Sequence, residues 1–236
     1  MTALDMPAGI ERLSVSARPI GTHLWRAILV LVGFSLLTAL WFWPLMPHLS
    51  GALLGPPEDN MQDFWNSWHT AKAAGWHDFF HTRQIRFPEG TPLYYHSFAY
   101  PQVFAVAFLA RLFGNSFATL VTLHNLTLLA SFPLAAMGAF YLARHLIEDR
   151  PGRDLGAAAA GFIFAFNPWH VAQAMHHAHV STIQFLPLFV LCYLVALKRR
   201  SLRLLGLAAL LDALSALSCW YFFFYLFYFM AFHLLY

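Results

Sequence analysis

The sequence predicts an all-α fold: a polytopic bundle of membrane-spanning helices with a long extracytoplasmic first loop that carries interfacial helices. Hydrophobic residues make up 59% of the chain and charged residues only 11%, whereas soluble domains contain about 25% charged residues. Trp, Tyr and Phe make up 17%, and aromatic residues gather at membrane interfaces. The apolar residues also come in long stretches, at 27–45, 116–142, 155–169, 180–197 and 204–236.

The first of these stretches predicts a permanent first transmembrane helix. Residues 1–26 are mixed and polar, and 27–45 are long enough to cross a bilayer, which needs about 20 residues. A cleaved signal peptide would have a shorter apolar region. We therefore expect a cytoplasmic tail over 1–26 and a transmembrane module over 27–236. In that module 27–45 spans, 46–115 is an extracytoplasmic loop, and 116–236 holds the remaining spans.

A sixth, shorter apolar stretch, 98–113, decides the topology. If it spans, the basic clusters of the tail and of the later loops lie on opposite sides of the membrane. If it lies in the interface, all ten of those basic residues share one side: Arg12, Arg18, Arg26, Arg144, Arg150, Arg153, Lys198, Arg199, Arg200 and Arg203. Basic residues near spans favour the cytoplasm. We therefore expect an interfacial segment and a cytoplasmic N-terminus.

The last stretch, 204–236, is too long for one straight span. A helix of 33 residues would measure about 50 Å, against a hydrocarbon core of about 30 Å. We expect a break near 218–221. The chain ends at Tyr236 with no polar flank, so we expect a fragment of a longer protein, which need not be active by itself.

Nucleic-acid binding is not indicated, because the formal charge is only +3. Cys192 and Cys219 both lie in apolar stretches, without disulfide or zinc-type spacing, and are expected to serve in packing.

The first segment with chemical potential is an acidic amphipathic helix that follows Pro56 and Pro57. Asp59 or Asn60 is expected to cap it, and it should run to about Ala74. One face is apolar (Met61, Phe64, Trp65, Trp68 and Ala71) and is expected in the lipid boundary. The other face (Asp59, Asp63, Asn66 and Thr70) is expected to line a cavity. Carboxylates one turn apart suit a general base or a metal ligand, although a solvated polar face would show the same pattern.

Two further segments of the same predicted side are candidates for substrate binding. The turn over 86–96 carries Arg86, which could hold a phosphate, and ends at His96. The turn His176-His177-Ala178-His179, followed by Gln184, could bind metal or phosphate or transfer protons. For both segments, the alternative interpretation is an ordinary connecting turn without a binding role.

Asp212 lies inside an apolar stretch. A carboxylate at membrane depth should face protein and is a functional candidate by default. We favour a structural hydrogen bond between helices, with His124 and Asn125 as candidate partners.

Together these segments resemble the GT-C superfamily of integral membrane glycosyltransferases. The resemblance rests on 58–60 (EDN) with 65–68 (WNSW), on 87–93 (FPEGTPL) with His96, and on 161–168 (GFIFAFNP) with the histidine turn. The segments are most similar to those of uncharacterised bacterial multi-pass proteins of that superfamily, and the resemblance therefore implies the inner membrane of a bacterium. The resemblance covers about 41–221 and is specific as to group rather than reaction.

The resemblance implies a donor, a base and a set of contacts. The donor would be a polyprenyl-phosphate sugar, bound from the bilayer and transferred to an extracytoplasmic acceptor. The catalytic base falls on Asp59 by position, with Glu58 beside it where the group usually has glycine. The substrate contacts would be Asp63, Arg86, His96, His176, His177, His179 and Gln184. A divalent cation, Mg²⁺ or Mn²⁺, could be held by Asp59 and His179. The resemblance implies nothing about the oligomeric state.

Two other readings stay open from the sequence alone. A polytopic transporter or lipid flippase would account for the spans. A membrane metalloenzyme with histidine boxes would account for the HxxxH spacing of His77 and His81 together with the histidine turn.

Overall fold

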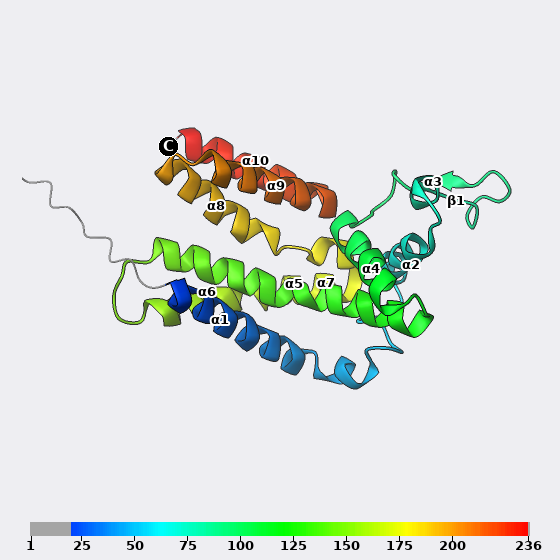
Figure 1. The fold of residues 1–236 in the computed structure, drawn as a ribbon, viewed down its shortest axis with the longest axis horizontal. Helices are drawn as coiled ribbons and strands as arrows, with labels where there is room; N and C mark the ends of the chain where they lie inside the picture. The colour runs from blue at the N-terminus through cyan, green and yellow to red at the C-terminus, as the bar shows by residue number, and fades with distance from the viewer. Residues whose placement is uncertain (1–19, 236) are drawn as a thin grey trace, which may run out of the picture.

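The computed structural model describes residues 20–235, which form a bundle of roughly antiparallel helices with a small polar lobe at one end (Figure 1). The helices are α1 Ile20–Trp41, α2 Asp59–Lys72, α3 Trp76–Phe80, α4 Tyr100–Phe113, α5 Phe117–Leu146, α6 Arg153–Ala165, α7 Pro168–His176, α8 Phe185–Arg199, α9 Leu202–Ser218 and α10 Trp220–Leu235. Two 3-10 helices, η1 Trp43–His48 and η2 Ala178–Ser181, and the antiparallel strands β1 His81–Thr82 and β2 Thr91–Pro92 complete the fold.

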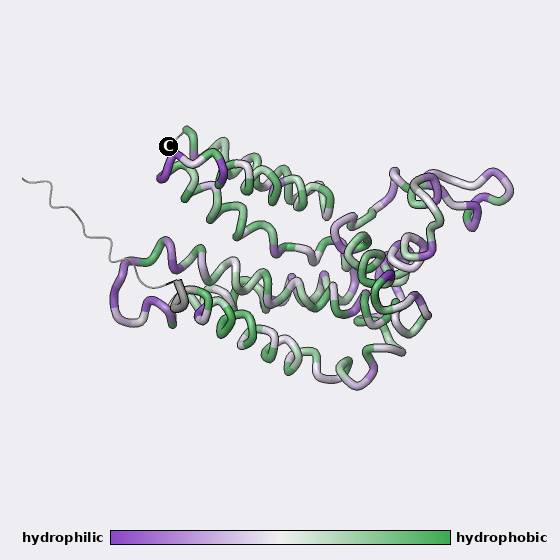
Figure 2. Tube along the Cα trace, in the orientation of Figure 1, coloured by the Kyte–Doolittle hydropathy of each residue, from purple (hydrophilic) through white to green (hydrophobic). Residues whose placement is uncertain are grey.

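Four helical stretches are long and apolar enough to cross a membrane: Leu24–Trp41, Phe117–Leu146, Arg153–His176 and Ala178–Arg199. They include the four predicted spans 27–45, 116–142, 155–169 and 180–197, with shifted ends. Figure 2 shows the hydrophobic residues along these helices and the hydrophilic ones gathered at the ends. The chain is therefore a polytopic helical membrane protein.

Prolines and caps explain the shifted ends. The first helix stops at Trp41 rather than at 45, because Pro44 cannot continue an α-helix and the chain tightens into η1. The third span breaks at Phe166, since the Asn167 side chain accepts a hydrogen bond from the His170 backbone N–H and starts α7.

Basic residues meet at the end of the bundle where α1 begins. Asp154 accepts a hydrogen bond from Arg144 Nε at 2.7 Å and lies 3.5 Å from Arg26. Between Arg26 and Arg144 the chain runs out along α1 and back along α5 (Figure 1). This arrangement agrees with the predicted one-sided basic clusters; Arg12 and Arg18 lie outside the described residues.

The short helix α4 lies across the opposite end of the bundle, beside α2 (Figure 1). Its 14 residues are too few for a span of the usual length. Its buried side chains Val106 and Ala110 pack with Phe64 of α2 and with Leu120 and Val121 of α5. The helix therefore covers the end of the bundle.

The predicted break in the last stretch is confirmed. Helix α9 ends at Ser218, α10 starts at Trp220, and the two helices run side by side as a hairpin (Figure 1). Both cysteines are free thiols, and Cys219 is buried in the core.

The predicted partners of Asp212 are wrong. His124 Nδ1 lies 3.1 Å from the Ser67 hydroxyl, and Asn125 Nδ2 donates to the carbonyls of Leu49 and Ala52. Both side chains therefore hold the polar lobe on α5. Asp212 Oδ1 is buried and makes no hydrogen bond within the described part of the chain.

Candidate functional site

The start of α2 is fixed against the end of α7 by a close backbone contact. The Asn60 side chain donates to the carbonyl of Leu54 at 2.5 Å and also to that of Met175. Gly55 has a φ of +88°, and a Cβ atom there would lie 1.9 Å from the Met175 carbonyl oxygen. Only glycine fits this approach. The acidic end of α2 is thus held beside the histidine turn.

Two carboxylate–histidine pairs follow from this contact. His176 Nδ1 lies 2.7 Å from Glu58 Oε2, and His177 Nδ1 lies 2.9 Å from Asp59 Oδ2. An ionised carboxylate only accepts hydrogen bonds, so Nδ1 of each imidazole is the donor and Nε2 is left as the basic nitrogen. All four side chains are 40–60% exposed, so these pairs stabilise the fold by only about 0–1 kcal/mol.

The third pair is buried. Asp63 is 4% exposed, and its Oδ2 accepts the backbone N–H of His179 at 3.2 Å while lying 3.3 Å from His179 Nδ1. A buried carboxylate held by two donors is fixed in position. Asp63 therefore links η2 to α2 and fixes the position of the histidine turn relative to α2.

Helix α2 differs from the prediction in its cap and in its apolar face. Its N-cap is Glu58, without a side-chain cap bond, and Asp59 is the first helical residue. Phe64, expected in the lipid boundary, is buried against α4 and α5. Asn66 and Thr70 of the opposite face are buried too, and Asn66 Nδ2 donates to the Ser97 carbonyl. Both faces of α2 therefore pack against protein.

An open groove of about 700 Å³ lies between α2 and the hairpin of β1 and β2. Six polar or aromatic residues line it, Gln62, Trp65, Gln84, Thr91, Tyr95 and His96, together with the apolar Ile85, Pro92 and Leu93. Trp65 Nε1 donates to Gln84 Oε1 at 3.1 Å, and the Gln62 amide lies 3.2 Å from His96 Nδ1. Trp65, also predicted to face lipid, thus lines the groove instead.

His96 connects the groove to the buried pair. Burial lowers the pKa of its imidazole from the ordinary value of 6.5, while the nearby Asp63 carboxylate raises that pKa and His179 lowers it. The imidazole is therefore neutral at pH 7. It lies within electrostatic reach of the Asp63–His179 pair and forms part of the groove wall.

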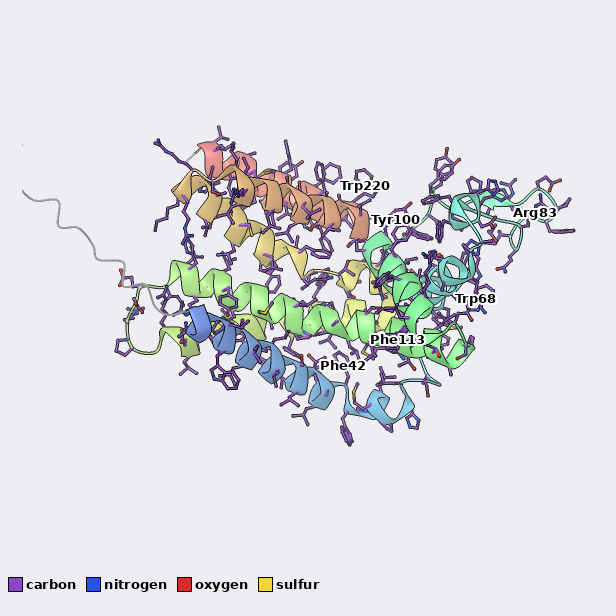
Figure 3. All side chains as sticks on the ribbon, in the orientation of Figure 1. Phe42, Trp68, Arg83, Tyr100, Phe113 and Trp220 are labelled. Atoms are coloured by element: carbon purple, nitrogen blue, oxygen red, sulfur yellow. The ribbon has the colours of Figure 1, made fainter. Side chains whose placement is uncertain are left out.

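The other predicted site residues stand apart from this cluster. Arg86 lies on the exposed hairpin turn, with a φ of 57°, and makes no ion pair with a carboxylate of the described chain. The hairpin projects away from the bundle, as Arg83 on the same turn shows (Figure 3). Gln184 precedes α8, and its Oε1 is buried with no hydrogen bond to a described residue.

The expected metal ligands do not converge. Asp59 is paired with His177, and His179 with Asp63. Within residues 20–235, no group of three or more His, Cys, Asp or Glu side chains has an arrangement that could hold a metal ion. His77 and His81 have their rings 5.1 Å apart on the segment of α3 and β1, and they join no such group with the histidine turn.

Sequence reasoning missed Gly55 and the roles of Asn60, Gln62 and Gln84. The signal for Gly55 was the turn Gly55-Pro56-Pro57 directly before the acidic helix. Nothing in the local pattern indicated that Gln84, 19 residues further along the chain, would accept from Trp65.

A comparison with protein-family models, with curated proteins and with solved structures gives no match.

Proposed function

We propose that the chain acts as a bacterial inner-membrane glycosyltransferase that moves a sugar from a polyprenyl-phosphate donor to an extracytoplasmic acceptor. The observation that carries this proposal is the row of carboxylate–histidine pairs between α2 and the histidine turn. Proton-transferring groups at the end of a membrane bundle suit a reaction between a lipid-linked substrate and a polar one.

An apolar cavity supports a lipid donor. It measures about 410 Å³ and is lined by Pro44, Leu45 and His48 of η1, by the loop 52–55 and by Val171 and Met175 of α7. Met175 immediately precedes His176, so this cavity ends next to the first carboxylate–histidine pair. An isoprenoid chain lying there would bring its phosphate to the polar row.

The Asp59–His177 pair is the proposed base. It would take the proton of the acceptor hydroxyl as that oxygen forms a bond to the anomeric carbon. The bond from the anomeric carbon to the phosphate oxygen would break, and its electron pair would leave with the polyprenyl phosphate. His176 and His179 would donate hydrogen bonds from Nε2 to the leaving phosphate only as imidazolium ions, with Nδ1–H kept on their carboxylate partners, and such bonds would offset the charge of the phosphate.

The test is sugar release from the donor by the protein in membranes. Radiolabelled polyprenyl-phosphate sugars would be supplied to the wild-type protein and to the Asp59→Asn and Glu58→Gln variants. Asp59→Asn should lower the rate about 100- to 10,000-fold, and membrane insertion should be unchanged. Glu58→Gln should cost less.

The control is Glu89→Gln on the exposed hairpin turn. It should keep the wild-type rate. Loss in Glu58→Gln with normal transfer by Asp59→Asn would move the base to Glu58, and wild-type rates in both variants would remove this site from the chemistry.

A further inference from the structure

We infer that the groove between α2 and the β1–β2 hairpin binds a neutral glycan as the acceptor. This inference rests on the proposed function and names the chemical class of its second substrate. A volume of about 700 Å³ falls within the 300–1,000 Å³ typical of small-ligand pockets.

The lining favours a carbohydrate. Trp65 and Tyr95 present aromatic rings, and Gln62, Gln84 and Thr91 add amide and hydroxyl groups. The C–H faces of a sugar ring can pack on aromatic rings while its hydroxyls exchange hydrogen bonds with amides. The lining therefore matches both kinds of surface that a sugar presents.

The Trp65 ring is held in one orientation. Its plane stacks on His69, with ring centroids 4.9 Å apart and an angle of 14°, and its Nε1 donates to Gln84. One face is thus covered by His69. A ring fixed in this way can receive a ligand without losing further side-chain freedom.

The charge of the lining selects among sugars. The described residues that line the groove include no Asp, Glu, Lys or Arg, and burial lowers the pKa of the one imidazole among them, that of His96, which disfavours a positive charge there. A uronic acid or a phosphorylated sugar would lose hydration without meeting an opposite charge. Neutral hexose units are therefore the class that fits.

The groove lies on the side of α2 that carries Asp59. Gln62 follows Asp59 by three residues on this helix, so the two side chains are neighbours on its surface, and His96 in the groove wall is within electrostatic reach of Asp63 and His179. A glycan in the groove would have one end directed toward the row of carboxylate–histidine pairs. The hydroxyl at that end would be the attacking group.

The experiment is ligand-observed NMR and calorimetry on the protein in nanodiscs. The probes are neutral disaccharides of glucose, galactose and mannose, with a uronic-acid disaccharide for comparison. At least one neutral disaccharide should bind, and the uronic-acid one should not. Trp65→Ala should weaken binding about tenfold or more. Gln84→Ala, on the exposed hairpin, should weaken it without any risk to the core.

Trp43→Ala is the matched control, because Trp43 is an exposed tryptophan on η1 outside the groove. It should bind like wild type. The inference is overturned if no neutral disaccharide binds, or if binding is equal in wild type, Trp65→Ala and Gln84→Ala. Donor cleavage is measured on the same preparation: cleavage without glycan binding removes only this inference, and glycan binding without cleavage removes only the proposed function.

Discussion

His177 Nδ1 lies 2.9 Å from Asp59 Oδ2, although 118 residues separate the two side chains in the sequence. The contact joins the first loop after α1 to the turn between α7 and η2. It depends on backbone packing at Gly55 and Met175 rather than on the strength of the pair itself, since exposed ion pairs stabilise proteins weakly.

The topology is the first prediction. Single cysteines at Asn115 and at Gly152 should be labelled from opposite sides of the membrane, because these positions lie at opposite ends of α5. Asn115 should react with an impermeant maleimide added outside the cell, and Gly152 only after the membrane is opened. Labelling of Asn115 from the cytoplasm would contradict the proposed topology.

Gly55→Ala should separate α2 from α7. The added Cβ would overlap the Met175 carbonyl, and alanine at a φ of +88° costs about 1–3 kcal/mol. Thermal unfolding in detergent should shift downward, and transfer should fall. Gly51→Ala is the matched control, since a Cβ there meets nothing within 4 Å. Equal melting temperatures for both variants would show that the close approach is absent.

Asp63→Ala should loosen the histidine turn. Removing a buried acceptor leaves the His179 N–H unsatisfied, which costs about 1–3 kcal/mol of the free energy of unfolding. Hydrogen exchange should become faster at residues 177–182. Asp59→Ala serves for comparison, because its exposed pair should change stability by less than about 1 kcal/mol. Unchanged exchange in Asp63→Ala would refute its positioning role.

The pKa of His96 should respond to its two charged neighbours in opposite directions. Asp63 raises this pKa, so Asp63→Asn should lower it further, and His179→Gln should raise it. Because the folded-state pKa lies below the unfolded value of about 6.5, the unfolded chain binds the proton more readily. Stability should therefore fall as the pH drops below about 6.5 and level off below the folded-state pKa. NMR titration of labelled histidines measures both shifts, and shifts of one sign would contradict the assignment.

The sequence was enough to predict the membrane class and the break after Ser218, because hydropathy is a local signal; the interfacial position of α4 stays a prediction. The sequence also predicted that Asp59 and the histidine turn lie at the same end of the helical bundle. It could not predict that Trp65 would bond Gln84 or that Phe64 would be buried under α4. An apolar helix face can be covered either by lipid or by other parts of the protein. Because both surroundings favour the same apolar residues, the sequence pattern does not distinguish between them.

The pairing of the carboxylates and histidines could not be predicted for a related reason. Composition shows that carboxylates and histidines share one side, but only the register between α2 and the turn decides which side chains pair. In the structure that register gives three separate pairs rather than one convergent set.

The most direct test of the central claim is a double-mutant comparison of Asp59 and His177 in the sugar-transfer assay. Groups that act as one unit give strongly non-additive losses. Asp59→Asn and His177→Gln should each lower the transfer rate by about 100-fold or more, and the double variant should be no slower than the slower single variant. Losses that multiply in the double variant, or a wild-type rate in either single variant, would contradict a catalytic Asp59–His177 pair.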